Sequence, residues 1–431
     1  MKENLANRRY ASDTSSDVCR GAGLSAYRSD MRFCALSYRR SAAGLLALGV
    51  SLSSCRDATA PGPGGVHGRW YQSQPDWARA RPAVFGNVVY FGDGYGEVIA
   101  RDVTTGERKW SNKVARDPIN GANLLVRSGV VVAPVIGFTV GLDAVSGREL
   151  WWYEAPDDTV GVPPGYVAPG TVWDSRIDAD DETVYIPAWG ASVSAVDLHT
   201  GIARWVWQPG RIDGDTATSG VFRSGSMSVR VSGDTIFATL WHFVNRPGGF
   251  SEAWVVAIDR VTGRELWRVR LPYAGSGVLI EAMPVVYQNL VIVHTLSART
   301  YAIDRATQKV VWEFTVTSAH LSTIAGAELY GDVLYVDGGD EQIHALRARD
   351  GSVIWSAPIP VPATRDLLVT QRRIIFPIGG QLIVLDRETG GTVALTTQPH
   401  TYDPLFSSAA AFSNGLVFVT VAGAAWCFDE P

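Results

Sequence analysis

The fold of this chain is decided by the stretch Ala100-Arg101-Asp102-Val103-Thr104-Thr105-Gly106-Glu107-Arg108-Lys109-Trp110. It combines a short apolar run, an Asp, a turn that closes on a Gly, and a Trp eight residues after the Asp. The pattern recurs, and successive positions equivalent to Asp102 lie 39 to 62 residues apart. A repeat of this length determines the architecture. The repeated pairs are Asp102 with Trp110, Asp143 with Trp151, Asp197 with Trp205, Asp259 with Trp267, Asp304 with Trp312, Arg347 with Trp355 and Asp386 with Ala394, before a last copy that reaches Asp429.

One repeat unit contains four short segments that are typical of strands. Asn87–Phe91 and Val98–Ala100 are runs of β-branched and aromatic residues on either side of a Gly-rich turn. The Asp that follows opens the next turn, because its carboxylate can accept a hydrogen bond from the backbone N–H two residues on, and Gly supplies the positive φ that closes it. Trp110 then lies on a third strand, and Pro82–Phe85 upstream completes four strands, named A to D. Such a unit cannot bury both faces alone, so neighbouring units must stack.

The number of repeats predicts an all-β fold, an eight-bladed β-propeller of four-stranded antiparallel blades. The last copy, Leu416–Asp429, lacks its D strand. Gly68-Arg69-Trp70, near the start of the repeat region, resembles a D strand without its blade. We therefore expect this N-terminal strand to complete the last blade and to close the ring without a free edge.

The start of the chain reads as an export signal. Residues 1–30 are polar and without period, and Met31 is the expected start of translation. Arg39-Arg40 form a basic region ahead of the short apolar run 41–50, which is too short for a transmembrane helix. Leu52-Ser53-Ser54-Cys55 resembles a bacterial lipobox, which implies that Cys55 is lipidated; a plain cleaved signal is the alternative.

These features divide the chain into three parts. Residues 1–54 form an upstream segment with a lipoprotein-type signal peptide, 55–67 form the lipidated Cys and a Pro/Gly tether, and 68–431 form the propeller. Of the other cysteines, Cys427 alone lies after Cys55, which leaves no intramolecular disulfide in the mature chain, and we expect it to be buried. The formal net charge of −5 argues against a nucleic-acid partner.

The repeat resembles that of quinoprotein-type (PQQ-like) propellers, on the pattern Ala-x-Asp-x-x-Thr-Gly-x-x-x-Trp. An eight-bladed, single-domain form with a lipobox resembles the BamB family of outer-membrane assembly lipoproteins. The resemblance covers about residues 70–431, and the same blade serves enzymes and scaffolds. It implies an outer-membrane location facing the periplasm, with cell-surface exposure as an alternative. It also implies a monomeric propeller whose only membrane contact is the lipid anchor, and partners among envelope proteins, chiefly the barrel-forming assembly protein.

Three insertions interrupt the period, and all belong to one face of the predicted ring. They are the D–A connections 154–177 and 208–222 and the B–C loop 241–250. Long loops on a rigid scaffold tend to carry function, and aromatic residues and Arg dominate interface hot spots. We therefore expect a partner-binding rim there; packing of these loops against each other is the alternative. The candidate rim residues are Tyr166, Trp173, Arg211, Arg223, Trp241, His242, Phe243 and Phe250.

The sequence contains no recognisable catalytic motif, and it predicts no catalytic residue, cofactor or metal. Asp174, Asp178 and the run 180–182 form a carboxylate cluster, but its spacing matches no known calcium loop. Scattered histidines and the repeat Trp residues fit structural roles better than catalytic ones. The histidines in question are His242, His294, His320 and His344.

Three functions remain after these exclusions. The favoured one is a non-enzymatic, lipid-anchored scaffold that binds other proteins in envelope and outer-membrane protein assembly. The alternative is a quinoprotein dehydrogenase with pyrroloquinoline quinone and Ca²⁺ in the ring centre, although the chain lacks the adjacent cysteines that many such enzymes carry. A surface lipoprotein that binds a glycan or a peptide fits the aromatic rim equally well.

Overall fold

The computed structural model describes the propeller region with gaps. All described residues belong to one compact unit, Arg56–Pro431. The side chains of residues 73, 224–227, 242–244, 250–251, 395–396 and 421 lie outside the description, and so do all of 1–67. The described residues are 68–73, 80–115, 119, 123–135, 137–156, 176–188, 192–209, 224–244, 250–272, 280, 282–316, 326–360, 366–378, 381–396, 408–421 and 424–431.

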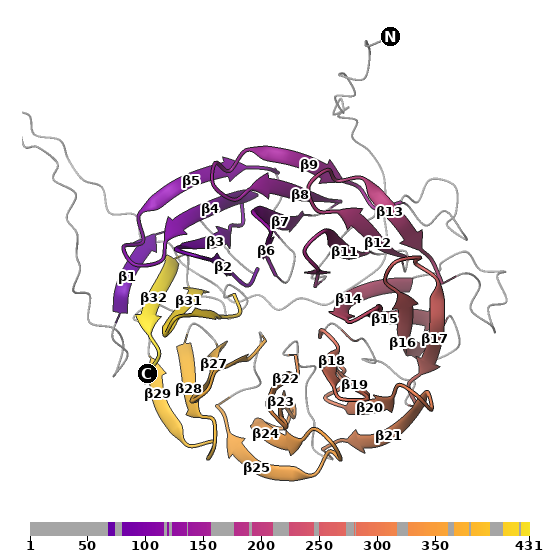
Figure 1. Ribbon diagram of the computed structural model, residues 1–431. Helices are drawn as coiled ribbons and strands as arrows, with labels where there is room; N and C mark the ends of the chain where they lie inside the picture. The colour runs from indigo at the N-terminus through magenta and orange to yellow at the C-terminus, as the bar shows by residue number, and fades with distance from the viewer. Residues whose placement is uncertain are drawn as a thin grey trace, which may run out of the picture. The chain divides into compact units, whose positions relative to one another are not determined.

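The strands of this unit form eight four-stranded antiparallel sheets, which follow one another around a common centre (Figure 1). They are named blades 1 to 8, with strand A innermost and strand D outermost. Blade 1 contains β2 (Ala83–Phe85), β3 (Val88–Gly92), β4 (Glu97–Asp102) and β5 (Arg108–Lys113); blade 2 contains β6 (Leu125–Arg127), β7 (Val130–Val135), β8 (Phe138–Asp143) and β9 (Glu149–Tyr153); blade 3 contains β10 (Asp178–Ala179), β11 (Thr183–Ala188), β12 (Ser192–Asp197) and β13 (Ala203–Trp207); blade 4 contains β14 (Ser224–Ser232), β15 (Thr235–Val244), β16 (Phe250–Asp259) and β17 (Glu265–Arg270). Blade 5 contains β18 (Val285–Tyr287), β19 (Leu290–His294), β20 (Thr300–Asp304) and β21 (Lys309–Phe314); blade 6 contains β22 (Glu328–Tyr330), β23 (Val333–Asp337), β24 (Gln342–Arg347) and β25 (Val353–Pro358); blade 7 contains β26 (Leu368–Val369), β27 (Arg373–Ile378), β28 (Gln381–Asp386) and β29 (Thr392–Thr396); blade 8 contains β30 (Ala411–Ser413), β31 (Leu416–Val421), β32 (Ala424–Asp429) and β1 (Gly68–Ser73).

The ring is closed by β1, which confirms the predicted closure. This strand pairs antiparallel with β32, so that Trp70 lies opposite Cys427 and Tyr71 opposite Trp426. The indigo β1 and the yellow β32 lie side by side in Figure 1. The last blade is therefore built from both ends of the propeller region, and its C and D strands are not joined by a turn. Among the described residues, no helix is long and apolar enough to span a membrane.

Each repeat Asp organises the turn between strands C and D. Asp102 Oδ1 accepts hydrogen bonds from the backbone N–H groups of Thr104 (2.9 Å) and Thr105 (3.1 Å). Gly106 N donates to the Asp102 carbonyl (2.9 Å), with φ of 70° at this Gly. In the fifth copy Gln308 takes the Gly position and keeps the turn at φ 57°, in the region that favours glycine. In other copies, too, the repeat Asp accepts a hydrogen bond at Oδ1 from the backbone N–H of the third residue after it. These residues are Asp143, Asp197, Asp259, Asp304 and Asp386.

Replacing this Asp should destabilise the blade measurably. We expect Asp102→Ala to lower the free energy of unfolding by about 1–2 kcal/mol, because the turn N–H groups of Thr104 and Thr105 lose their acceptor and Asn87 and Lys109 lose their partner. Asp181→Ala is the matched control, since Asp181 is an exposed carboxylate with one surface ion pair to Arg127. Denaturant unfolding followed by Trp fluorescence measures both. Equal destabilisation by the two substitutions would contradict the turn-organising role of Asp102.

Where the next blade has a Gly in its C–D turn, the repeat Trp contacts that Gly; the turn of blade 5 has Gln308 instead. A Cβ placed on Gly106 would lie 2.6 Å from the ring of Trp70, and one on Gly147 would lie 2.5 Å from Trp110. These glycines are therefore required both for positive φ and for the close approach of an indole ring. The indoles of Trp70, Trp110, Trp151 and Trp205 also donate Nε1–H to carbonyls at the same turns, those of Val103, Ala144, Leu198 and Arg260.

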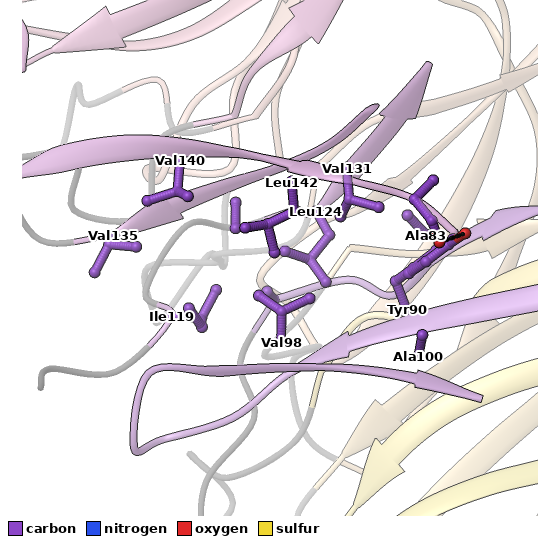
Figure 2. Packing of buried hydrophobic residues seen from close by; sticks show 13 residues of the cluster. Ala83, Tyr90, Val98, Ala100, Ile119, Leu124, Val131, Val135, Val140 and Leu142 are labelled. Carbon is purple, nitrogen blue, oxygen red and sulfur yellow. Dashed lines mark hydrogen bonds between the residues drawn. The ribbon is translucent and has the colours of Figure 1, made fainter. Parts of the chain in front are cut away.

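Apolar clusters fill the spaces between blades. The cluster between blades 1 and 2 combines Tyr90 and Val98 of blade 1 with Val131 and Leu142 of blade 2, all nearly inaccessible to solvent (Figure 2). Tyr90 also donates its hydroxyl to the Ala144 carbonyl (3.1 Å). Because each blade shares such a cluster with the next, the ring buries one continuous series of cores.

The two faces of the ring are defined by hydrogen bonds. On one face, D–A connections meet B–C turns: Ile119 N donates to the Asp93 carbonyl (3.0 Å) and Ile359 N to that of Glu341 (2.8 Å). We call this the connection face. On the other, C–D turns meet A–B turns: Val103 N donates to the Asn87 carbonyl (3.2 Å). We call this the turn face.

The prediction of a B–C loop over 241–250 is wrong in its bounds. β15 continues to Val244 and β16 begins at Phe250, and the two strands pair without interruption up to Val244 opposite Phe250. The connection is thereby limited to 245–249, where Pro247 and two Gly residues disfavour a regular strand. Blade 4 thus has ten-residue B and C strands, longer than those of the other blades.

Candidate functional site

An ion pair crosses the centre of the ring. Arg176, just before the A strand of blade 3, donates from Nε to Asp366 Oδ2 (3.0 Å) and from Nη2 to Asp366 Oδ1 (2.7 Å). Asp366 precedes the A strand of blade 7, on the opposite side of the eight-bladed ring. Both side chains are nearly excluded from solvent, with exposed fractions of 4% and 11%. A buried, bidentate Arg–carboxylate pair of this kind is among the strongest charge-assisted hydrogen-bond arrangements.

Further contacts tie other blades to this pair. Gly326 N, from the segment before blade 6, donates to Asp366 Oδ1 (2.8 Å). Arg81, before blade 1, donates from Nη2 to Glu328 Oε1 (3.1 Å) and to the Leu367 carbonyl (2.9 Å). Burial raises the pKa of Asp366, but the positive charges of Arg176 and Arg81 outweigh it and lower the pKa to about 2. The central network therefore joins blades 1, 3, 6 and 7.

The described residues of the ring centre do not fit a quinone with Ca²⁺. A calcium site needs several carboxylate or carbonyl oxygens that are free to coordinate the ion. Asp366 is instead bonded to a guanidinium and a backbone N–H, and Glu328 to Arg81. No group of three or more metal-binding side chains occurs among the residues that the structure describes.

The predicted partner-binding rim is only partly described. Trp241 lies on β15 with 7% of its surface exposed, so its indole does not present a free anchor to a partner. His242 and Phe243 lie on the same strand, and Phe250 begins β16, instead of all lying in a loop. Four rim residues lie outside the described part of the chain: Tyr166, Trp173, Arg211 and Arg223.

The carboxylates of the predicted cluster are held separately. Asp178 accepts a hydrogen bond from Val231 N (3.0 Å), whereas Asp180 accepts from the Tyr185 hydroxyl (2.8 Å) and from Arg260 (2.9 Å). Asp181 and Glu182 form surface ion pairs with Arg127 and Arg204. Each carboxylate thus has a different partner, while Asp174 and Cys55 lie outside the described residues.

Two of the four histidines lie close together at the connection-face ends of blades 5 and 6. His294 Nδ1 lies 2.9 Å from Thr300 Oγ1, and His344 Nε2 lies 3.1 Å from Asp340 Oδ1. Burial lowers the pKa of His294 to about 4, and the nearby His344 adds to this lowering. His320 lies outside the described residues. Nothing in the sequence pattern linked these two histidines, because they belong to different repeats.

The thiol of Cys427 is buried, as expected. It has no solvent exposure and is not in a disulfide. Burial raises its pKa to about 12. A thiol with this pKa is protonated at neutral pH and is a poor nucleophile.

Eight four-stranded blades with Asp–Gly–Trp turns define the class of this protein as a PQQ-type β-propeller. Residues 69–137 and 249–430, more than half of the chain, match the family model described as "Outer membrane protein assembly factor BamB". The chain belongs to this family.

Two curated relatives carry the same description. An outer membrane protein assembly factor BamB from Nitrosomonas eutropha is 29% identical over 190 residues, which cover 41% of this chain and 44% of the relative. One from Xanthomonas campestris pv. campestris is 25% identical over 337 residues, which cover 69% and 77%. The chain therefore spans less than half of the first relative's length.

Solved structures share the fold at low identity. BamB from Moraxella catarrhalis has a TM-score of 0.52 at 18% identity, with 86% of this chain and 94% of that chain covered. A quinohemoprotein alcohol dehydrogenase from Comamonas testosteroni has a TM-score of 0.62 at 14% identity, with 85% and 76% covered. A BamB protein and an alcohol dehydrogenase match comparably well, so these likenesses bear on the fold alone.

Proposed function

We propose that this protein is a non-enzymatic scaffold that binds other envelope proteins during outer-membrane protein assembly. Residues 1–54 would contain the export signal, Cys55 would be lipidated, and 55–67 would tether the propeller 68–431 to the periplasmic side of the outer membrane. The family membership supports this function. The proposed partner is the barrel-forming assembly protein, and the proposed contact is the rim on the connection face, including residues 211, 223 and the tip of the blade 4 hairpin.

The central ion pair is the observation that supports a non-enzymatic function. Arg176 and Asp366 cross the ring where a quinone would have to lie in the alternative function, and they satisfy each other. A cofactor in the same place would have to break a buried ion pair, which typically costs several kcal/mol, about 3–5 when one partner is left unpaired. The ring centre therefore favours a closed scaffold over an open catalytic pocket.

Capture of the partner tests the proposed function. The lipidated, tagged protein is purified from envelopes in mild detergent, beside a variant whose residues 245–249 are replaced by Asn-Gly, a two-residue hairpin turn. We expect the native protein to retain the barrel-forming protein and the shortened variant to lose about ten-fold of it, since rim contacts supply the binding energy.

A matched control is Glu388→Ala, which removes an exposed side chain (80%) on the turn face without changing the backbone of the turn. It should capture the partner as well as the native chain does. Full capture by the shortened, still folded variant removes the hairpin tip from the contact. Failure of the native protein to capture the barrel-forming protein, together with saturable binding of pyrroloquinoline quinone and Ca²⁺, would overturn the scaffold function.

A further inference from the structure

The turn face exposes aliphatic side chains on three neighbouring blades. Val145 (88% exposed), Val261 (73%) and Ile202 (67%) have the highest exposed fractions among the large hydrophobic residues that the structure describes. They belong to the C–D turns of blades 2, 4 and 3. The same turns in blades 1 and 7 place Thr104 and Glu388 at the position of Val145 and Val261. Exposed aliphatic residues gathered in one part of a surface mark interaction sites more often than isolated ones do.

A cavity opens between blades 3 and 4 at this surface. Its volume is about 390 Å³, and it is lined by the A–B turn of blade 3, by Arg204 and Trp205 of β13, and by Arg260 and Val261 of the blade 4 turn. Buried Tyr185 also borders it. The cavity therefore has an aromatic side and an exposed aliphatic edge, and its size falls within the range of ligand-binding clefts.

The two arginines of the cavity already pair with two partly buried carboxylates, Asp180 and Asp197, which we call the inner carboxylates. Arg260 Nη1 donates to Asp180 Oδ2 (2.9 Å), and Arg204 Nη2 donates to Asp197 Oδ2 (2.8 Å). Burial raises the pKa of Asp180, but its hydrogen bonds from backbone N–H groups, Tyr185 and Arg260 outweigh this and lower it overall. Both inner carboxylates are therefore ionised at neutral pH and neutralise the arginines that face the cavity.

Three exposed carboxylates, which we call the outer carboxylates, give this surface an excess of negative charge. Asp181, Glu182 and Asp234 are exposed at 81%, 77% and 92%. Glu182 lies 3.4 Å from Arg204 and Asp234 lies 3.7 Å from Arg260, so both share guanidinium groups that already bind inner carboxylates more closely. Asp181 alone has its own partner, Arg127. The rim of the cavity therefore attracts cations.

We propose that this surface, the blade 3–4 turn site, binds an extended segment of a partner protein in which Lys or Arg residues alternate with aliphatic residues. An extended segment places successive side chains on opposite sides, so that its apolar residues can reach Val261, Ile202 and the cavity while its cations face the exposed carboxylates. Anionic lipid headgroups and nucleic acids are repelled by the same charges. The site lies on the face opposite the proposed rim, so it adds a second contact to the proposed function and does not depend on the first.

Peptide binding tests this site with the mature full-length protein in detergent. The probe is a fluorescein-labelled peptide of alternating Val and Arg, compared with peptides of alternating Val and Glu and of alternating Gly and Arg. Fluorescence anisotropy should show saturable binding of the Val–Arg peptide only. The double variant Asp181→Lys, Glu182→Lys should weaken its Kd about ten-fold, because two exposed anions become cations, and Val261→Ser should weaken it less.

Glu388→Lys is the control, because it turns one exposed anion into a cation on the same face of blade 7, where the turn carries no exposed aliphatic residue. It should leave the Kd unchanged. Equal weakening by Glu388→Lys would show diffuse attraction and overturn the site, as would equal binding of the Gly–Arg peptide or insensitivity to the blade 3 variants. All substituted side chains are exposed, and unchanged thermal unfolding verifies that the fold is retained.

Discussion

Replacing Asp366 by Ala should lower the free energy of unfolding by about 3–5 kcal/mol, the range for breaking a buried ion pair by removal of one partner. Arg176 would remain nearly excluded from solvent, without the carboxylate that accepts hydrogen bonds from its Nε and Nη2. Gly326 N would lose its acceptor as well. Such a loss is a large fraction of the stability of most domains, about 5–15 kcal/mol. Chemical denaturation at neutral pH, followed by Trp fluorescence, measures it.

A second variant separates loss of the pair from general damage to the ring centre. Arg176→Met with Asp366→Leu removes both charges and leaves neither one unpaired, so the double variant should be more stable than Asp366→Ala. Asp429→Ala is the surface comparison, since Asp429 pairs with Arg69 at exposed fractions of 41% and 55% and should change little. If the double variant is as unstable as the single one, shape and not charge holds the centre, and the argument against a catalytic ring centre weakens.

The ring and its closure could be predicted because they depend on local chemistry that each repeat carries. The Asp–Gly turn and the following Trp need only neighbouring residues and the next copy, so their spacing reveals the number of blades and the missing D strand. Contact with the next copy also explains why Ala394 takes the place of the repeat Trp in blade 7. The repeat Trp residues contact the Gly of the C–D turn of the next blade wherever that turn has one, and blade 8 has no such turn because β32 and β1 come from opposite ends of the propeller region.

The ring centre could not be predicted from the sequence. Arg176 and Asp366 are 190 residues apart and lie in segments without period, so neither repeat position nor spacing connects them. The extent of the blade 4 hairpin was mispredicted for a different reason. The extra length of this repeat was assigned to a loop over 241–250, although the alternation of Trp241, Phe243 and their neighbours is compatible with strands up to the turn itself.

Acidification from pH 6.5 to 4 should destabilise the native protein by about 3 kcal/mol through His294 alone. The folded chain keeps this imidazole neutral, since burial lowers its pKa to about 4, whereas the unfolded chain protonates it near pH 6.5. Between these values the unfolded state binds more protons, so stability rises with pH. The contribution of His294 is therefore complete above pH 6.5 and is lost as pH falls toward 4. Asp366 acts in a separate window, below about pH 4, because its folded pKa is about 2.

His294→Asn isolates this effect, because its amide can occupy the position of Nδ1 beside Thr300 while it does not titrate. The variant should show a flatter dependence of unfolding free energy on pH between 6.5 and 4, even if it is less stable at neutral pH. His199→Asn, at an exposed C–D turn of blade 3, is the control and should retain the native dependence. Denaturant titrations at several pH values supply the comparison. A native-like slope in His294→Asn would assign the acid sensitivity to groups other than His294.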